Sequence, residues 1–372
     1  MISRVQDLHY MTLALRLAAK GRRTTSPNPM VGAVVVNQGR VVGQGFHFRP
    51  GLPHAEILAL RRAGRGARGA TLYVTLEPCC HRNKRTPPCV PEVIHSGVRR
   101  VVSAMNDPNP LVRGKGAAAL RRAGLSVTVG VARRKAEELN KAYSYWIKTK
   151  RPYVICKAGM TLDGQIATAS GAAKWITGKQ SRQEVHRLRS YMDAVLVGIG
   201  TVLTDDPALT ARVGPRLSKL ASKQPLRVVV DSALRIPMNA AILSNQERAK
   251  TVVAATDSAS ASRKRALLRR GIEVLTLPNV RGKVSLPALM RELGKRGVTS
   301  LLVEGGGEIN AAMLKAKLVQ HVRLYMAPAL LGGVDAKGLI GGKSPARLTL
   351  ALRLRNVTTR FVGSDLLVEG DL

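Results

Sequence analysis

The segment Pro53-His54-Ala55-Glu56 opens a predicted helix, and Thr75-Leu76-Glu77-Pro78-Cys79 follows a predicted strand. Imidazole and thiolate are side chains that bind zinc, and a catalytic zinc site takes about three protein ligands and leaves one position for water. A neighbouring carboxylate can then take and deliver protons. Because residues two apart point about 200° away from each other on a regular helix, His54 and Glu56 can face one ion only where the helix begins. The pattern therefore predicts a metal site at the mouth of a helix, beside the end of a strand.

His-x-Glu followed by Pro-Cys is the signature of zinc-dependent deaminases of nucleobases, in which the second cysteine usually comes from Pro-Cys-x-x-Cys. Position 82 of this chain is arginine, and the next thiol after Cys80 is Cys89, preceded by Thr86-Pro87-Pro88. We assign Cys80 to packing, since two neighbouring residues rarely both reach one small ion. A set of buried free thiols would explain each cysteine alone, but not the His-x-Glu beside Pro-Cys. We therefore expect three zinc ligands and one proton shuttle: His54, Cys79 and Cys89, and Glu56.

Helix-like and strand-like segments alternate over about the first 147 residues. Apolar runs at 31–36 and 41–46 are divided by an Asn-Gln-Gly turn, which predicts a hairpin. A single helix is expected at Ala132–Ile147, near the end of this region. The order predicts helices covering a mixed sheet, in a first domain at residues 1–148.

The basic, proline-ended stretch 148–152 marks the predicted boundary, so the second domain is placed at 149–372. Strand–helix–strand order there predicts a largely parallel sheet, and the last strand that we assign is Val322–Ala327. The polar stretch at about 213–224 is expected to be an exposed excursion.

The chain carries 60 Lys and Arg against 23 Asp and Glu, a net charge of +37. Such a balance suggests binding to polyanions. The charge is spread evenly, however, with +19 in residues 1–150 and +18 in the remainder, and aromatic residues make up only 3%. A solvated basic surface that favours small anionic substrates is therefore preferred over a dedicated nucleic-acid site.

Cellular context is indicated by the cysteines and by the apolar runs. Three of the four cysteines lie within eleven residues, which favours metal binding or catalysis over a disulfide framework. No run approaches the ~20 apolar residues that span a bilayer, and the N-terminus lacks the apolar block of a signal peptide. We expect a cytoplasmic enzyme with no membrane partner.

From Met11 to about Gly333 the chain resembles the bifunctional deaminase–reductase family of riboflavin biosynthesis. The segments that carry the resemblance are Thr24-Thr-Ser-Pro-Asn-Pro-Met-Val-Gly32, His54-Ala-Glu56, Thr75-Leu-Glu-Pro-Cys79, Asp107-Pro-Asn-Pro110, Thr161-Leu-Asp-Gly164, Lys174-Trp-Ile-Thr177, Val197-Gly-Ile-Gly-Thr-Val-Leu-Thr-Asp-Asp-Pro207 and Val303-Glu-Gly-Gly306. The resemblance implies an α/β fold: a cytidine-deaminase-like three-layer α/β/α domain, then a dihydrofolate-reductase-like α/β domain. It also implies two reactions, zinc-dependent removal of the 2-amino group of a diamino-ribosylamino-pyrimidinone 5′-phosphate and NADPH-dependent reduction of the ribosyl group to ribityl.

The resemblance also implies site residues. Around the deaminase substrate they are Asn28, His47, Arg85, Asp107 and Asn109. At NADPH they are Gly159, Trp175, Thr201, Asp205, Ser232, Gly306 and Gly307. At the reductase substrate they are Ala173, Arg189, Leu209, Arg212 and Glu304.

Residue chemistry supports part of the implied reductase site. The segment Val303–Glu308 follows a strand and opens a helix, where backbone N–H groups and the helix dipole can meet a phosphate, although a simple turn would read the same way. Arg189 and Arg212 could each pair with a phosphate oxygen or be solvated.

Two departures from the family pattern are visible. The loop between Cys79 and Cys89 is one residue longer than usual, and Ala173 stands where serine is common. Two alternatives stay open at this point: an RNA or nucleoside deaminase with an appended domain, and a basic nucleic-acid-binding protein on an inactive deaminase fold. The oligomeric state is also open, with a homo-oligomer as one alternative.

Overall fold

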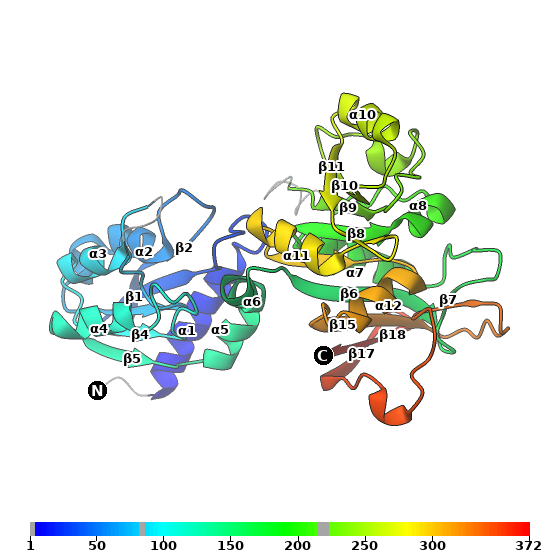
Figure 1. Ribbon diagram of the computed structural model, residues 1–372. Helices are drawn as coiled ribbons and strands as arrows, with labels where there is room; N and C mark the ends of the chain where they lie inside the picture. Colours follow the sequence, from blue (N-terminus) through cyan, green and yellow to red (C-terminus); the bar gives the residue numbers. More distant parts are fainter. Residues whose placement is uncertain (1–3, 82–85, 215–222) are drawn as a thin grey trace. The chain divides into compact units, whose positions relative to one another are not determined.

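The computed structural model describes residues 4–81, 86–214 and 223–372, and the chain divides into two compact units, 1–150 and 151–372 (Figure 1). The boundary predicted at 148/149 lies two residues before this division. Within the described residues, no helix has both the length and the apolar character needed to cross a membrane.

The first unit contains a five-stranded sheet in the order β2-β1-β3-β4-β5. β1 (Gly32–Asn37) pairs antiparallel with β2 (Arg40–Phe46) and with β3 (Thr71–Val74), so the predicted hairpin is confirmed. β4 (Arg100–Ser103) and β5 (Ser126–Val129) continue the sheet in parallel. The sheet is therefore mixed, as the sequence predicts.

Helices cover both faces of this sheet, and two glycines allow them to approach closely. A Cβ on Gly32 would lie 2.1 Å from the carbonyl oxygen of Ala14 in α1 (Arg4–Ala19), and one on Gly43 would lie 2.1 Å from that of Ala59 in α2 (Ala55–Ala63). Gly43 pairs with Val35 of β1, so these two residues face the same side of the sheet. Because side chains alternate along a strand, Val35 and Gly32 face opposite sides. α1 and α2 therefore lie on opposite faces. α3 (Cys89–His95) and α4 (Lys115–Arg122) complete the layer of α2.

The single helix predicted at Ala132–Ile147 is wrong. The structure has α5 (Arg133–Leu139) and α6 (Lys141–Thr149), separated at Asn140. The carboxamide of Asn140 accepts from the Met30 N–H at 2.8 Å and donates to the Met30 carbonyl at 2.9 Å. The residue leaves the helical conformation because its side chain is bound to the backbone of a distant loop.

The second unit contains a nine-stranded sheet in the order β11-β10-β9-β8-β14-β6-β15-β18-β17. Its strands are β6 (Tyr153–Thr161), β8 (Ala194–Gly198), β9 (Leu226–Val230), β10 (Thr251–Thr256), β11 (Glu273–Leu277), β14 (Ser300–Val303), β15 (His321–Ala327), β17 (Arg355–Val362) and β18 (Asp365–Asp371). All pairings from β11 to β15 are parallel, so the largely parallel sheet is confirmed. The antiparallel hairpin β17–β18 follows the last strand that we had assigned.

The helices of this unit are α7 (Lys179–Arg189), α8 (Ile199–Asp205), α10 (Ala261–Arg269), α11 (Leu286–Lys295) and α12 (Gly307–Lys315). Short strands β7 (Gln165–Ala167) and β16 (Lys337–Gly338) form a separate pair, as do β12 (Asn279–Val280) and β13 (Lys283–Val284). α8 follows β8 directly, and α12 follows β14 after a short glycine-rich turn. Both helices therefore begin at the carboxyl ends of adjacent parallel strands, the edge of an open α/β sheet where ligands bind.

Candidate functional site

His54, Cys79 and Cys89 converge in the first unit. His54 precedes α2 in an extended conformation (φ −71°, ψ 164°), and Cys89 is the first residue of α3. The Nδ1 atom of His54 lies 3.2 Å from Sγ of Cys89 and 3.6 Å from Sγ of Cys79. Tetrahedral zinc with ordinary bond lengths would separate nitrogen and sulfur ligands by about 3.5 Å. The three donor atoms, all within 4.8 Å of one another, therefore fit a zinc ion.

Backbone and side-chain contacts hold these ligands in place. The N–H groups of Cys89 and Val90, at the start of α3, donate to the Cys79 carbonyl at 3.0 and 3.2 Å. The Thr86 hydroxyl lies 3.0 Å from Nε2 of His54, the ring nitrogen opposite the one that faces the sulfurs. Such a contact to the outer nitrogen orients a metal-binding imidazole. Thr86 lay within the segment quoted for the cysteine spacing, but only the folded loop shows its contact.

Glu56 lies in the first turn of α2 and is buried. Within the described residues, its Oε2 atom has no hydrogen-bond partner. Burial raises the pKa of this carboxyl, and the neighbouring His54 only partly offsets the effect. A buried carboxyl with an open acceptor beside three candidate zinc ligands is suited to holding and releasing a proton.

Two residues predicted at the deaminase substrate form a pair beside the zinc donors. Nδ2 of Asn28 lies 3.0 Å from Nε2 of His47, whose Nδ1 lies 3.3 Å from the Pro53 carbonyl. The rings of His47 and His54 are 5.2 Å apart, edge to face. The loop before β1 is thus joined to the start of α2.

Asp107 and Asn109 belong to the loop after β4. The Asp107 carboxylate accepts from the Asn109 N–H at 2.8 Å and from the Tyr143 hydroxyl at 3.1 Å. Burial raises the pKa of Asp107 to about 6. The Asn109 carboxamide oxygen accepts from the Leu111 N–H within its own turn. Arg85, also predicted here, lies outside the described residues.

Glu77 organises the same loop, although we assigned it no role from the sequence. Its carboxylate accepts from the N–H groups of Asp107, Gly114 and Ala117 at 2.9–3.1 Å, and it is buried. The sequence signal for this role was an acidic residue directly after an apolar strand and before Pro78-Cys79. A carboxylate buried at such a place is stable when backbone N–H groups donate to it.

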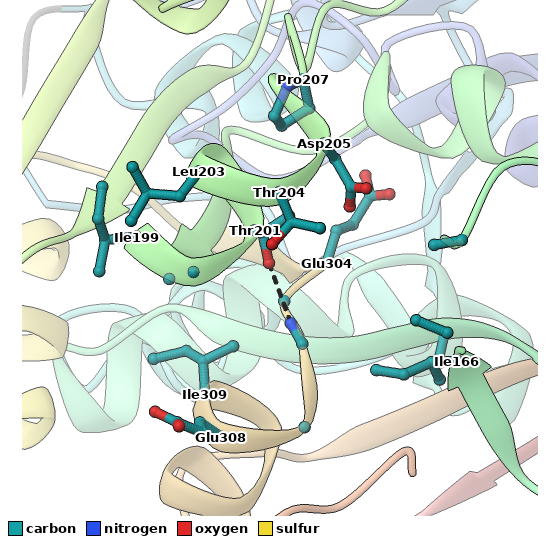
Figure 2. Close-up of a pocket in the computed structure, with 18 of the residues that line it drawn as sticks. Ile166, Ile199, Thr201, Leu203, Thr204, Asp205, Pro207, Glu304, Glu308 and Ile309 are labelled. Carbon is teal, nitrogen blue, oxygen red and sulfur yellow. Dashed lines mark hydrogen bonds between the residues drawn. The ribbon is translucent and has the colours of Figure 1, made fainter. Parts of the chain in front are cut away.

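A cavity of about 1070 Å³ lies at the carboxyl ends of the strands in the second unit. Figure 2 shows Thr201 and Asp205 on α8, and Glu304 after β14, around it. Every residue predicted for NADPH or the reductase substrate lines this one cavity: Gly159, Ala173, Trp175, Arg189, Thr201, Asp205, Leu209, Arg212, Ser232, Glu304, Gly306 and Gly307.

One part of the cavity wall consists of two helix N-termini. Gly306 precedes α12, and its N–H donates to the Thr201 hydroxyl of α8 at 3.2 Å (dashed in Figure 2). A Cβ on Gly307 would lie 2.7 Å from the Gly338 carbonyl oxygen, so only glycine fits. Backbone N–H groups at such helix starts bind phosphates, which fits a dinucleotide.

Another part of the wall is a buried charge cluster. Nη2 of Arg189 lies 2.9 Å from Oε2 of Glu304, and Nζ of Lys157 lies 3.2 Å from the same oxygen. Burial opposes ionisation of Glu304, but the two cations outweigh it and lower its pKa to about 2. Of the two alternatives for Arg189, a solvated side chain is wrong, since its charge is paired with Glu304. Lys157 was missed, although a lysine inside an otherwise apolar strand is a signal of a buried partner.

Comparison with known proteins accounts for both units. Residues 4–105 match the cytidine and deoxycytidylate deaminase zinc-binding region, and residues 152–368 match the RibD C-terminal domain. Riboflavin biosynthesis protein RibD of Aquifex aeolicus is 42% identical over 362 residues, 97% of each chain. The structure of Acinetobacter baumannii RibD, form 1, matches with a TM-score of 0.89 at 36% identity, covering 99% of both chains. The Thermotoga maritima diaminohydroxyphosphoribosylaminopyrimidine deaminase/5-amino-6-(5-phosphoribosylamino)uracil reductase matches with a TM-score of 0.85 at 33% identity, again over 99% of both chains.

The chain belongs to the RibD family.

Members of the RibD family combine a deaminase and a reductase, so this chain is a bifunctional enzyme of riboflavin biosynthesis. The predicted α/β fold, a cytidine-deaminase-like domain followed by a reductase domain, is confirmed, and the second domain matches the RibD C-terminal domain. The family is favoured over the two alternatives left open by the sequence, because the second unit is a reductase domain and not an unrelated appendage.

Proposed function

We propose that this chain converts 2,5-diamino-6-(ribosylamino)pyrimidinone 5′-phosphate in two steps. In the first unit water replaces the 2-amino group and ammonia leaves. In the second unit NADPH and a proton reduce the opened ribosyl group to a ribityl chain. The observation that supports the first step best is the convergence of His54, Cys79 and Cys89 next to the buried carboxyl of Glu56.

The deaminase step needs a nucleophile and a proton carrier. The chemistry that zinc supplies in such a site is activation of water for attack on the ring carbon. Glu56 takes the proton from that water and delivers it to the ring nitrogen and then to the leaving amine. Asn28 and His47, fixed to each other and to the start of α2, position the pyrimidine, and Asp107 with Asn109 holds its far side. Arg85 is proposed to meet the phosphate.

The reductase step needs a bound dinucleotide and a held substrate. NADPH supplies a hydride. We assign its diphosphate to the start of α12, where Gly307 offers a backbone N–H and the bond from the Gly306 N–H to the Thr201 hydroxyl fixes the turn. Gly159, Trp175, Asp205 and Ser232 line the rest of the dinucleotide site.

The substrate half of the cavity is assigned to its cationic wall. Arg212 is exposed at the cavity and meets the 5′-phosphate, while Arg189 and Glu304 form the wall against which the ribose lies. Leu209 and Ala173 supply its apolar contacts. Because Ala173 lacks the hydroxyl that is common at its position, the substrate makes one hydrogen bond fewer there.

The net charge of +37 is assigned to general attraction of phosphorylated small molecules, without a nucleic-acid site. We propose a cytoplasmic location, and a homo-oligomer is compatible with the sequence. Filter binding of RNA at near-physiological salt tests whether the chain has a nucleic-acid site. Tight, steeply salt-dependent binding would show that it has one and would contradict this assignment.

A coupled assay tests the whole proposal. The diamino pyrimidine phosphate is supplied with and without NADPH, while ammonia and NADPH absorbance are followed together. Ammonia release should not require NADPH, and NADPH oxidation should require prior deamination. Oxidation of NADPH on the diamino substrate at the same rate would reverse the proposed order.

A further inference from the structure

His186 lies on α7 and lines the reductase cavity, yet no role has been assigned to it. Its Nε2 lies 3.0 Å from Nη2 of Arg212, and its Nδ1 lies 3.2 Å from the Thr210 carbonyl oxygen. A guanidinium can only donate and a carbonyl can only accept. These two contacts are satisfied together when Nε2 accepts and Nδ1 carries the proton, which is the neutral Nδ1–H tautomer. The backbone N–H of Arg212 is also directed at Nδ1, at 3.3 Å, and this longer contact is left unmade by that tautomer.

The surroundings of His186 keep the ring neutral. Burial lowers its pKa, and the cations Arg189 on the same helix and Arg212 on the facing loop lower it further, to about 4. The Thr210 carbonyl and Glu304, which follows β14, act in the opposite direction and are outweighed. At the pH of ordinary assays the imidazole is thus an uncharged acceptor for Arg212.

The two arginines of this cavity are held in different ways. Arg189 is bound by a carboxylate, which fixes its direction and also neutralises its charge. Arg212 forms no ion pair within the described part of the chain, and its contact is the imidazole. An imidazole fixes the direction of a guanidinium without cancelling its charge. Arg212 therefore keeps the full charge that an anionic ligand needs.

The backbone beneath Arg212 is fixed independently of His186. The N–H and carbonyl of Ala211 bond to the carboxamide of Gln224 at 2.7 and 3.0 Å. The Thr210 carbonyl also accepts from Nη1 of Arg189 at 3.2 Å. With the loop held in this way, the contact with His186 determines where the side chain of Arg212 points.

We propose that His186 is a positioning residue that aims the Arg212 guanidinium, with its charge intact, at the 5′-phosphate of the reductase substrate. This inference rests on the substrate role proposed above for Arg212.

Reductase kinetics of His186→Leu and His186→Gln test the proposal, with the deaminated 5′-phosphate and its dephosphorylated form as substrates. Loss of one hydrogen bond to a charged group should raise KM for the phosphate about tenfold in His186→Leu, with kcat changed less than about twofold. KM for the dephosphorylated form and for NADPH should not change. His186→Gln, whose carboxamide oxygen can accept from Arg212, should recover part of the loss. Arg187→Gln, exposed on the same helix, is the matched control. Equal loss with both substrates would overturn the proposal.

A double substitution separates this proposal from the one on which it rests. Arg212→Gln should raise KM for the phosphate, and adding His186→Leu should raise it no further. If Arg212→Gln leaves KM unchanged, the substrate role of Arg212 fails and His186 loses its role with it. If Arg212→Gln raises KM but the two changes act additively, only the His186 proposal fails.

Nitrogen-15 NMR of the wild-type enzyme is independent of how the variants fold. At pH 7 the His186 ring should show the shifts of a neutral Nδ1–H tautomer. A charged ring or the Nε2–H tautomer would overturn the proposal.

Discussion

Arg189 and Glu304 form a two-point ion pair at the reductase cavity, with Nε facing Oε1 and Nη2 lying 2.9 Å from Oε2. Lys157 contacts the same carboxylate, so two largely buried cations share one anion. The cluster therefore keeps a net positive charge. Its stability depends on Glu304 remaining ionised.

Stability of the reductase unit should fall on acidification. The pKa of Glu304 is lowered from 4.5 to about 2 in the folded chain, so its contribution is present above pH 4.5 and is lost as pH falls through 2. The pKa of the His186 imidazole is lowered from 6.5 to about 4. The stability that depends on a neutral His186 is therefore lost as the pH falls from 6.5 to 4. Urea unfolding at pH 7, 5 and 3, followed by Trp175 fluorescence in a Trp146→Phe background, measures the trend. A free energy of unfolding that is constant from pH 7 to 4 would contradict it.

At pH 7, Glu304→Gln should destabilise the same unit by about 3–5 kcal/mol, because it leaves Arg189 and Lys157 buried without their anion. Glu292→Gln, which removes only a partly exposed ion pair on α11, is the control and should change stability by less than about 1 kcal/mol. Equal effects of the two substitutions on the free energy of unfolding would show that the cluster around Glu304 stabilises the fold no more than an exposed ion pair does.

Glu56→Gln should retain zinc and lose deaminase activity by at least about 100-fold, because the carboxamide cannot carry the proton. NADPH oxidation on the already deaminated substrate should be unchanged. Ammonia release and metal content are measured together, and Glu92→Gln on the exposed face of α3 serves as the control. Deamination at the parental rate would show that another group moves the proton.

Cys89→Ser should lose zinc, whereas Cys80→Ser should keep it. The sulfur of Cys89 lies 3.2 Å from Nδ1 of His54, while Cys80 packs against the apolar core. Metal analysis after gel filtration distinguishes the two variants. Full zinc retention in Cys89→Ser, or loss in Cys80→Ser, would mean that the thiols are assigned wrongly. Removal of zinc by a chelator should abolish deamination and spare reduction.

Asp205→Ala should impair only the reductase, raising KM for NADPH without changing ammonia release. Asp205 lines the cavity, and its main-chain oxygen accepts from Nζ of Lys174 at 2.8 Å. Asp257→Ala, exposed after β10, is the control. An unchanged dependence on NADPH would remove Asp205 from the cofactor site.

Local sequence predicted much of the fold and the three residues that converge at the candidate zinc site. The hairpin and the parallel strands follow from apolar periodicity and turns. His54, Cys79 and Cys89 follow from ligand chemistry and spacing, since each residue type has few other uses in that pattern. The reductase residues came from the family resemblance, because a Gly-rich turn and scattered arginines do not define a cavity.

The remaining features of the fold and the site depend on contacts between residues far apart in sequence, which a local sequence pattern does not reveal. The break at Asn140 depends on Met30, which is 110 residues away in sequence. The pairing of Arg189 with Glu304 depends on α7 packing beside the end of β14. His186 looks like any histidine on a helix until the loop with Thr210 and Arg212 is folded against it.

The bond between Asn140 and Met30 limits how the first unit can be shortened. Met30 lies two residues after Asn28, so the segment that contacts His47 is tethered to the junction of α5 and α6. A fragment designed to end with β5, the last strand of the sheet, would contain His54, Cys79 and Cys89 but would lack Asn140, so this segment would lose its tether. Expression of an isolated deaminase should therefore extend beyond residue 140.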